Sequence, residues 1–89
     1  MNISIEVSMY PLDTNYLVPI QDYIDRLNQF EDIRVRTNSM STQIFGPYDT
    51  VMKAVSVANK HTFLEEEKVV FVMKMINSDL DYTYEKPSD

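Results

Sequence analysis

The sequence predicts one α+β domain, because short segments of strand character are interspersed with two segments whose apolar residues recur at helical spacing. The predicted order is strand, helix, strand, strand, helix, strand, and no linker or low-complexity stretch interrupts it. A chain of 89 residues is too short for two cores of useful size. We therefore expect a single domain over residues 1–80, followed by a polar C-terminal tail over residues 81–89.

The first half of the chain predicts a strand and then a helix. Residues 2–10 alternate strictly between apolar and polar side chains, which is typical of a half-buried strand. One face would carry Ile3, Ile5, Val7 and Met9, and the other Ser4, Glu6, Ser8 and Tyr10. Pro19 suits the first turn of a helix, and the apolar residues that follow continue at helical spacing until about Phe30.

A β-hairpin is predicted next. Residues 33–37 and 41–45 read as two strands joined by a tight turn at Ser39-Met40, which is not a favoured two-residue turn. If Asn38 lies opposite Ser41, then Gln43 and Phe45 share a face with Arg34, Arg36, Asn38 and Ser41. A turn that is longer or shorter by one residue would place Thr42 and Ile44 on that face instead.

The last two elements are a helix and an apolar strand. Asp49 can cap a helix whose predicted inner stripe is Val51, Ala54, Val55, Ala58 and Thr62. Residues 68–76 form the last strand, and Met9, Met73 and Met75 are expected in the core. The whole order is that of the ferredoxin-like βαββαβ fold, with an antiparallel sheet in the order 4-1-3-2, two helices on one face and the other face bare.

The bare face predicts self-association. If alternate residues of the last strand face the helices, then Val70, Val72 and Ile76 face water in a monomer. A second subunit or a C-terminal tail that folds back would cover them. A small core without cysteines also favours extra burial between subunits. Residues 77–89 are polar and are expected to fray.

Composition excludes several classes of function. A net charge of −6 with scattered basic residues argues against a nucleic-acid partner. No apolar run is long enough for a membrane span, and the alternating N-terminus is unlike a signal peptide, so we expect a cytoplasmic protein. His61 is the single histidine, and no glycine-rich loop or nucleophile triad is recognisable, so we expect neither a metal, a cofactor nor catalysis.

Residues 1–12 and 38–46 carry a resemblance to a known family. The second stretch, Asn38-Ser39-Met40-Ser41-Thr42-Gln43-Ile44-Phe45-Gly46, ends at the only glycine of the chain. Both stretches resemble the small single-domain thiamine-binding proteins, relatives of the bacterial hydroxymethylpyrimidine/thiamine-binding family. The resemblance covers about residues 1–80, although Ser39 stands where an alanine is usual and Pro47 where an acidic residue is usual. It implies a ferredoxin-like fold, a homo-oligomer such as a tetramer or dimer of dimers, and binding of a thiamine-type ligand without turnover.

The polar cluster on the predicted bare face suits an aminopyrimidine. Amide, hydroxyl and carboxylate groups there can both donate to and accept from its ring nitrogens and amine, and aromatic rings or a carboxylate could attract the thiazolium cation. The candidate ligand-binding residues are Glu6, Ser8, Tyr10, Asn38, Met40, Ser41, Thr42, Gln43 and Phe45. Three alternatives stay open: a polar network without a ligand, a regulatory or assembly module whose sheet face is only an interface, and a small enzyme with Glu6 as general base.

Overall fold

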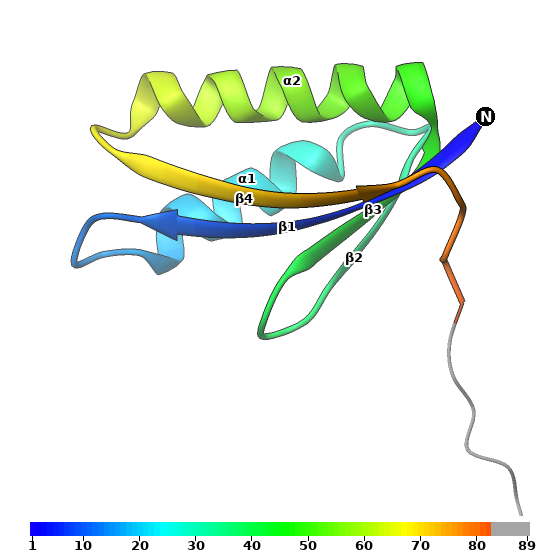
Figure 1. The fold of residues 1–89 in the computed structure, drawn as a ribbon. Coiled ribbons are helices and arrows are strands. Elements are labelled where there is room, and N and C mark those ends of the chain that lie inside the picture. Colours follow the sequence, from blue (N-terminus) through cyan, green and yellow to red (C-terminus); the bar gives the residue numbers. More distant parts are fainter. Residues whose placement is uncertain (83–89) are drawn as a thin grey trace, which may run out of the picture.

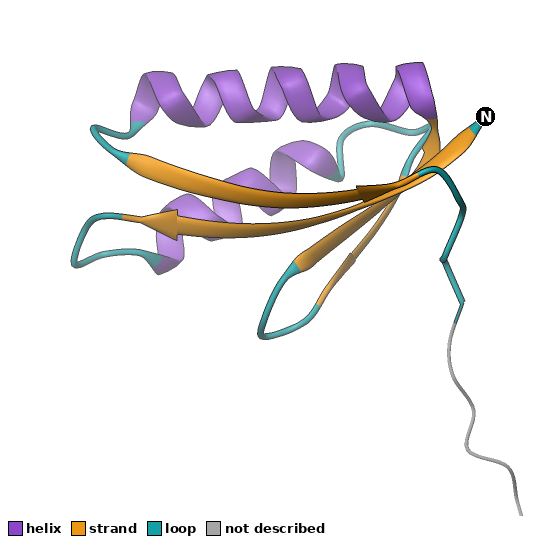
Figure 2. Cartoon of the chain, in the orientation of Figure 1, coloured by secondary structure: helices purple, strands orange, loops and turns teal. Residues whose placement is uncertain are grey.

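The chain folds into a four-stranded antiparallel sheet with two helices on one face, as Figure 1 shows. This computed structural model describes residues 1–82 (Figure 2). The elements are β1 (Asn2–Pro11), α1 (Leu17–Leu27), β2 (Arg34–Thr37), β3 (Thr42–Pro47), α2 (Tyr48–Glu65) and β4 (Val69–Ile76). The strands lie in the order β2-β3-β1-β4. The ferredoxin-like order and topology predicted from the sequence are therefore confirmed.

The core lies between the sheet and the helices. On the inner face of β1, Ile3, Ile5 and Val7 are only 3%, 1% and 2% exposed. The buried residues of α2 are the predicted stripe: Val51, Ala54, Val55, Ala58 and Thr62. Burial of a large aliphatic side chain stabilises a fold by roughly 1.5–3 kcal/mol. The alternation of β1 and the stripe of α2 thus fix which face of the sheet the helices cover.

Both helices begin or end at residues other than those predicted. The helix α1 ends at Leu27 rather than near Phe30, because the N–H groups of Gln29 and Phe30 donate to carbonyls three residues back instead of four. The Nδ2 of Asn28 also donates to the carbonyl of Ile24 in the last turn. The helix α2 begins at Tyr48, so Asp49 lies inside its first turn and makes no side-chain cap. The negative charge of Asp49 still stabilises the helix, because it lies near the positive end of the helix dipole.

Met75 was expected in the core, and this expectation was wrong. Met9 and Met73 pack against the core, whereas Met75 is 51% exposed. Met75 lies near the end of β4, which is an edge strand of the described sheet.

Gly46 connects β3 to α2 in a conformation that favours glycine. Its φ of +153° is the one positive φ among the described residues. A Cβ built there would lie 3.2 Å from Cγ2 of Val51 and 3.3 Å from the carbonyl oxygen of Asp32. Only a residue without a side chain lets β3 pass this close to the loop before β2 and enter α2 directly.

The described part of the C-terminal tail is attached to the sheet, contrary to the expected fraying. We call residues 77–82 the strap. The Ser4 hydroxyl of β1 donates to the carbonyl of Ser78 (2.6 Å) and accepts from the N–H of Leu80 (2.9 Å). Asp79 and Asp81 of the strap form ion pairs with arginines of β2. The strap therefore reaches from the end of β4 to the opposite edge strand; the rest of the tail, residues 83–89, lies outside the described part of the chain.

Candidate functional site: two cavities on either side of the hairpin

The hairpin register decides which side chains share a face. The N–H of Asn38 donates to the carbonyl of Ser41 (3.1 Å), and Arg36 and Arg34 lie opposite Gln43 and Phe45. This is the register with Asn38 opposite Ser41. Gln43 therefore lies on the bare face, whereas Thr42, only 7% exposed, lies on the face that the helices cover.

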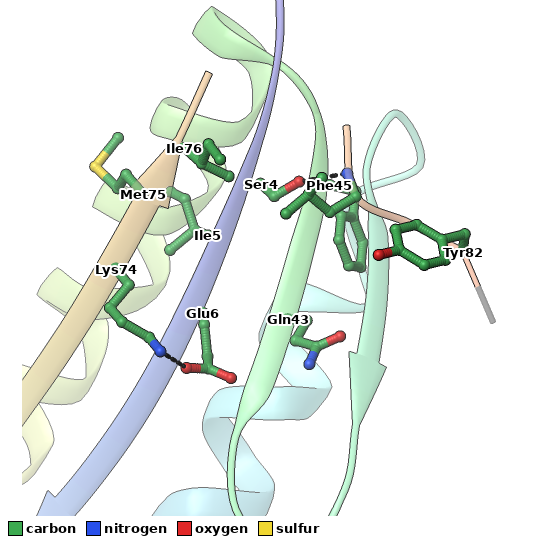
Figure 3. Close-up of a pocket in the computed structure, with 10 residues that line it drawn as sticks. Ser4, Ile5, Glu6, Gln43, Phe45, Lys74, Met75, Ile76 and Tyr82 are labelled. Atoms are coloured by element: carbon green, nitrogen blue, oxygen red, sulfur yellow. Dashed lines mark hydrogen bonds and ion pairs between the residues drawn. The ribbon is translucent and has the colours of Figure 1, made fainter. Parts of the chain in front are cut away.

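A row of polar side chains crosses the middle of the bare face. Glu6 pairs with Gln43 on one side and with Lys74 on the other, and Gln43 pairs in turn with Arg36. Nζ of Lys74 lies 2.9 Å from Oε1 of Glu6 (Figure 3). The Ser41 hydroxyl donates to Oε2 of the same carboxylate (3.1 Å). The hydrogen bond from Lys74, with that from Ser41, holds the pKa of Glu6 below its usual value. Glu6 thus already has a cationic partner.

The first cavity, which we call the sheet-face cavity, lies over this row and has a volume of about 440 Å³. Figure 3 shows side chains from β1, β3, β4 and the strap around it. It is lined by Ser4, Ile5, Glu6, Gln43, Phe45, Lys74, Met75, Ile76, Leu80 and Tyr82. Leu80 and Tyr82 belong to the strap, so the strap forms part of the cavity wall.

The second cavity, which we call the hairpin cavity, lies between the hairpin tip, the end of β1 and α1 and has a volume of about 290 Å³. It is lined by Val7, Met9, Tyr10, Tyr16, Ile20, Tyr23, Ile24, Thr37, Asn38, Ser39, Met40, Ser41 and Thr42. None of these lining residues is charged. The hydroxyls of Thr37 and Thr42 lie 3.3 Å apart.

The predicted site residues are divided between these cavities. Glu6, Gln43 and Phe45 line the sheet-face cavity. Tyr10, Asn38, Met40, Ser41 and Thr42 line the hairpin cavity. Ser8 lies opposite Val72 on the bare face and is absent from both linings. The candidates are therefore divided between two cavities, and the hydrogen bond from Ser41 to Glu6 connects the two groups.

Asn38 shapes the turn of the hairpin. Its Oδ1 accepts hydrogen bonds from the N–H groups of Met40 (2.8 Å) and Ser41 (3.0 Å). Asparagine often stabilises turns in this way. The turn that it holds belongs to the register in which Gln43, and not Thr42, lies on the bare face.

Sequence reasoning overlooked residues of both cavities. For the sheet-face cavity these include Lys74, whose place in the alternation of β4 opposite Glu6 was a usable signal. For the hairpin cavity they include Thr37 and three residues of α1: Ile20, Tyr23 and Ile24. Tyr23 is buried, which raises the pKa of its hydroxyl, and that hydroxyl donates to Oδ1 of Asn59 (2.7 Å). The apolar stripe of α1 predicted that these residues pack in the core. Such a pattern cannot show which of the residues also line a cavity.

Comparison with known proteins places this fold and its hairpin motif in one family. The profile of the thiamine-binding protein family matches residues 5–85, so the chain belongs to that family. No curated protein matches the sequence.

Solved structures agree with the fold. A hypothetical protein from Methanocaldococcus jannascii is 23% identical (TM-score 0.75, covering 91% of this chain and 84% of that one). A protein from Streptococcus pneumoniae is 20% identical (TM-score 0.78, 90% of each chain). A proposed thiamine biosynthesis/salvage protein from Thermotoga maritima is 10% identical (TM-score 0.78, 88% and 85%). At these identities the structural likeness concerns the fold alone.

Within residues 1–82 no group of three His, Asp or Glu side chains is placed to hold a metal ion. Neither α1 nor α2 combines the length and hydropathy needed to cross a bilayer.

Proposed function

We propose that the protein is a cytoplasmic homo-oligomer that binds thiamine or its hydroxymethylpyrimidine moiety in the hairpin cavity, without turnover. The observation that carries the proposal is the position of the family motif. Asn38, Met40, Ser41 and Thr42, which belong to that motif, all line this cavity. Gln43 and Phe45 of the same motif line the sheet-face cavity, so the proposal assigns the family's ligand to the cavity that holds the larger part of the hairpin motif.

The chemistry of the hairpin cavity suits this ligand. The Thr37 and Thr42 hydroxyls can each donate and accept, as the edge of an aminopyrimidine requires. Tyr16 and Tyr23 add aromatic surface, and aromatic faces attract cations such as a thiazolium. Ligand sites are usually lined by hydrophobic and aromatic side chains with a few convergent polar groups, and the hairpin cavity combines aliphatic and tyrosine side chains with hydroxyl and amide groups.

The charges of the sheet-face cavity suit a cation less well. The Glu6 carboxylate, expected to attract the thiazolium, is paired with Lys74. Arg34 and Arg36 stand on the same face, opposite Phe45 and Gln43. Both arginines are paired with Asp79 and Asp81 of the strap. A cation could therefore reach the Glu6 carboxylate only by displacing Lys74 from it.

The homo-oligomer is proposed from the outer side of β4. Val70, Val72 and Ile76 are 46%, 53% and 46% exposed on the bare face. The strap contacts β1 and β2 but leaves these side chains open to solvent. Of the two predicted covers, a second subunit accounts for the valines better than the strap does.

The test compares adjacent residues of β3 that point to opposite faces. Thr42→Val removes one hydroxyl from the hairpin cavity and keeps a β-branched side chain, while Gln43→Ala removes an amide from the sheet-face cavity. Calorimetric titration with thiamine and with hydroxymethylpyrimidine should show an affinity loss of about fivefold to a hundredfold for Thr42→Val, because a buried polar group of the ligand left without its partner costs about 1–3 kcal/mol. Gln43→Ala should bind like the wild type.

Three results would contradict the proposal. The reverse pattern, with loss only in Gln43→Ala, would place the ligand on the sheet face. Binding of neither compound at millimolar concentration by an intact oligomer would favour the assembly module. Consumption of thiamine during the titration, detected by chromatography, would show that the protein is an enzyme.

A further inference from the structure

Two arginine side chains stand side by side on the bare face, where the proposed function does not use them. Arg34 and Arg36 are alternate residues of β2 and lie opposite Phe45 and Gln43, which line the sheet-face cavity. The guanidinium of Arg34 lies 6.0 Å from the centre of the Phe45 ring. The arginine pair is thus next to a cavity of about 440 Å³.

Both arginines are bound by carboxylates of the strap. Asp81 bridges them, with Oδ2 at 2.5 Å from Nε of Arg34 and Oδ1 bonded to Nε of Arg36. Asp79 binds a second nitrogen of Arg34. The Asp81 side chain is only 6% exposed although it belongs to a segment that follows the last strand. The strap therefore presents two carboxylates as a compact dianion to two guanidinium groups.

Two neighbouring guanidinium groups that bind carboxylates in this way can also bind other oxyanions. Guanidinium groups bind carboxylate and phosphate in the same planar, two-pronged manner. Two of them carry a charge that matches a phosphate monoester or a diphosphate. Without the strap, Arg34, Arg36 and Lys74 would face one carboxylate, that of Glu6, so this part of the face would attract anions.

We propose that Arg34 and Arg36 form a binding site for the phosphate group of a small phosphorylated molecule, whose body occupies the sheet-face cavity, and that Asp79 and Asp81 occupy this site as an intramolecular substitute. The ligand displaces the two carboxylates and releases the strap. Since Leu80 and Tyr82 belong to the cavity wall, the same movement opens the cavity. This site is separate from the hairpin cavity and does not depend on the proposed function.

The ligand is small rather than a polyanion. A net charge of −6 repels a long phosphate chain, and the other basic residues are scattered along the sequence. Phe45 is only 3% exposed, and the Ser4 hydroxyl is bonded to Ser78 and Leu80 of the strap. Release of the strap frees the Ser4 hydroxyl for the ligand body, beside the Phe45 ring and the Gln43 amide of the cavity wall. The occupant that fits is therefore a phosphate or diphosphate ester of a small, partly aromatic molecule.

The strap limits the affinity because it is tethered to the site that it occupies. A tethered group competes at a high effective concentration. Removal of its two negative charges should therefore strengthen anion binding, and removal of the guanidinium groups should abolish it. These opposite effects separate a real site from a general attraction of anions.

The experiment titrates the protein with inorganic diphosphate at constant ionic strength and follows backbone amides by ¹⁵N NMR. The double variant Asp79→Asn with Asp81→Asn should bind about tenfold more tightly than the wild type. The matched control is Asp22→Asn with Glu67→Gln, which makes the same change in net charge at exposed positions on α1 and before β4. The control should bind within about twofold of the wild type. In the wild type, the Leu80 amide, bonded to Ser4 in the free protein, should move towards a random-coil shift as diphosphate binds.

Arginine variants test the geometry of the site. Arg34→Gln with Arg36→Gln should show no binding, and Arg34→Lys with Arg36→Lys, which keeps the charge, should still bind at least tenfold more weakly because it lacks the two-pronged contact. The lysine variant also tests the site if the glutamine variant fails to fold. Phenyl phosphate should bind more tightly than inorganic phosphate, because its ring can enter the cavity.

Several outcomes would overturn the proposal. One is an Asp79/Asp81 variant that binds no better than the charge-matched control. A second is a lysine variant with wild-type affinity. A third is equal affinity for phenyl phosphate and inorganic phosphate, and a fourth is an oligonucleotide that binds more tightly than diphosphate.

Discussion

Replacement of Asn38 by alanine should destabilise the hairpin as well as weaken ligand binding. The change removes the acceptor for two N–H groups, those of Met40 at 2.8 Å and Ser41 at 3.0 Å. A hydrogen bond contributes about 0.5–1.5 kcal/mol net, and at an exposed turn water replaces it in part, so the low end applies. The two bonds together are therefore worth about 1 kcal/mol, which corresponds to a fall in Tm of about 4–8 °C for a domain of this size.

A second variant separates the turn from the ligand. Asn38→Asp keeps an oxygen acceptor for both N–H groups but replaces the amide NH₂ by a second oxygen. We expect this variant to unfold in urea within about 0.5 kcal/mol of the wild type and to retain its affinity for thiamine in calorimetric titration. Asn38→Ala should lose stability and affinity together, because the turn positions Ser41 and Thr42.

Two results would refute this reasoning. An alanine variant as stable as the wild type would mean that the two bonds do not hold the turn. An aspartate variant with wild-type stability but an affinity as low as that of alanine would show that the Asn38 amide contacts the ligand directly.

Three more predictions concern the rest of the fold. Gly46→Ala should cost about 1–3 kcal/mol in urea unfolding, because φ is +153° and the new Cβ would lie 3.2 Å from Val51; a loss below about 0.5 kcal/mol would contradict this. Val72→Glu should dissociate the oligomer in light scattering by placing a carboxylate in an apolar contact, and a wild-type monomer at high micromolar concentration would disprove the interface. Asp79 and Asp81 have lowered pKa values, Asp79 chiefly through the N–H of Asp81 and Asp81 chiefly through Arg36, so their contribution is complete above about pH 4, the range of a free aspartate. It is lost as the pH falls through the lower folded pKa values; strap amides that are released already at pH 6 would contradict this.

Local sequence patterns predicted which side chains of β1 and α2 face the core. In β1 the strict alternation placed Ile3, Ile5 and Val7 against the helices, since a strand has only two faces and the core selects one. The stripe of α2 was predicted correctly because helical periodicity over many residues leaves little choice. The family resemblance added the motif and, through it, the ligand class.

The site could not be assembled from those patterns alone. Whether Thr42 or Gln43 faces the bare side depends on one residue in the turn, and the Asn38 side chain holds that turn. Both registers were compatible with the sequence. Thr42 was therefore grouped with Glu6, Gln43 and Phe45, which line the cavity on the other face of the sheet.

Contacts between distant segments were also beyond the sequence. The strap looked like a fraying tail because its residues are polar, yet the partners of Asp81 lie in β2, at the other edge of the sheet. Likewise, the pairing of Lys74 with Glu6 became visible only once β1 and β4 were aligned. The sequence shows which residues are charged, but only the folded structure shows with which residues they pair.

The position of Lys74 has a consequence for the behaviour of the protein at high concentration. The strand β4 has the sequence VVFVMKMI and lies at an edge of the described sheet, and Lys74 is its one charged residue. Long apolar edge strands invite edge-to-edge pairing and amyloid-like stacking, and a lysine within such a strand opposes both. The side chain that neutralises Glu6 therefore also acts as a gatekeeper against aggregation. An apolar substitution of Lys74 would free Glu6 and at the same time leave an uninterrupted apolar edge eight residues long.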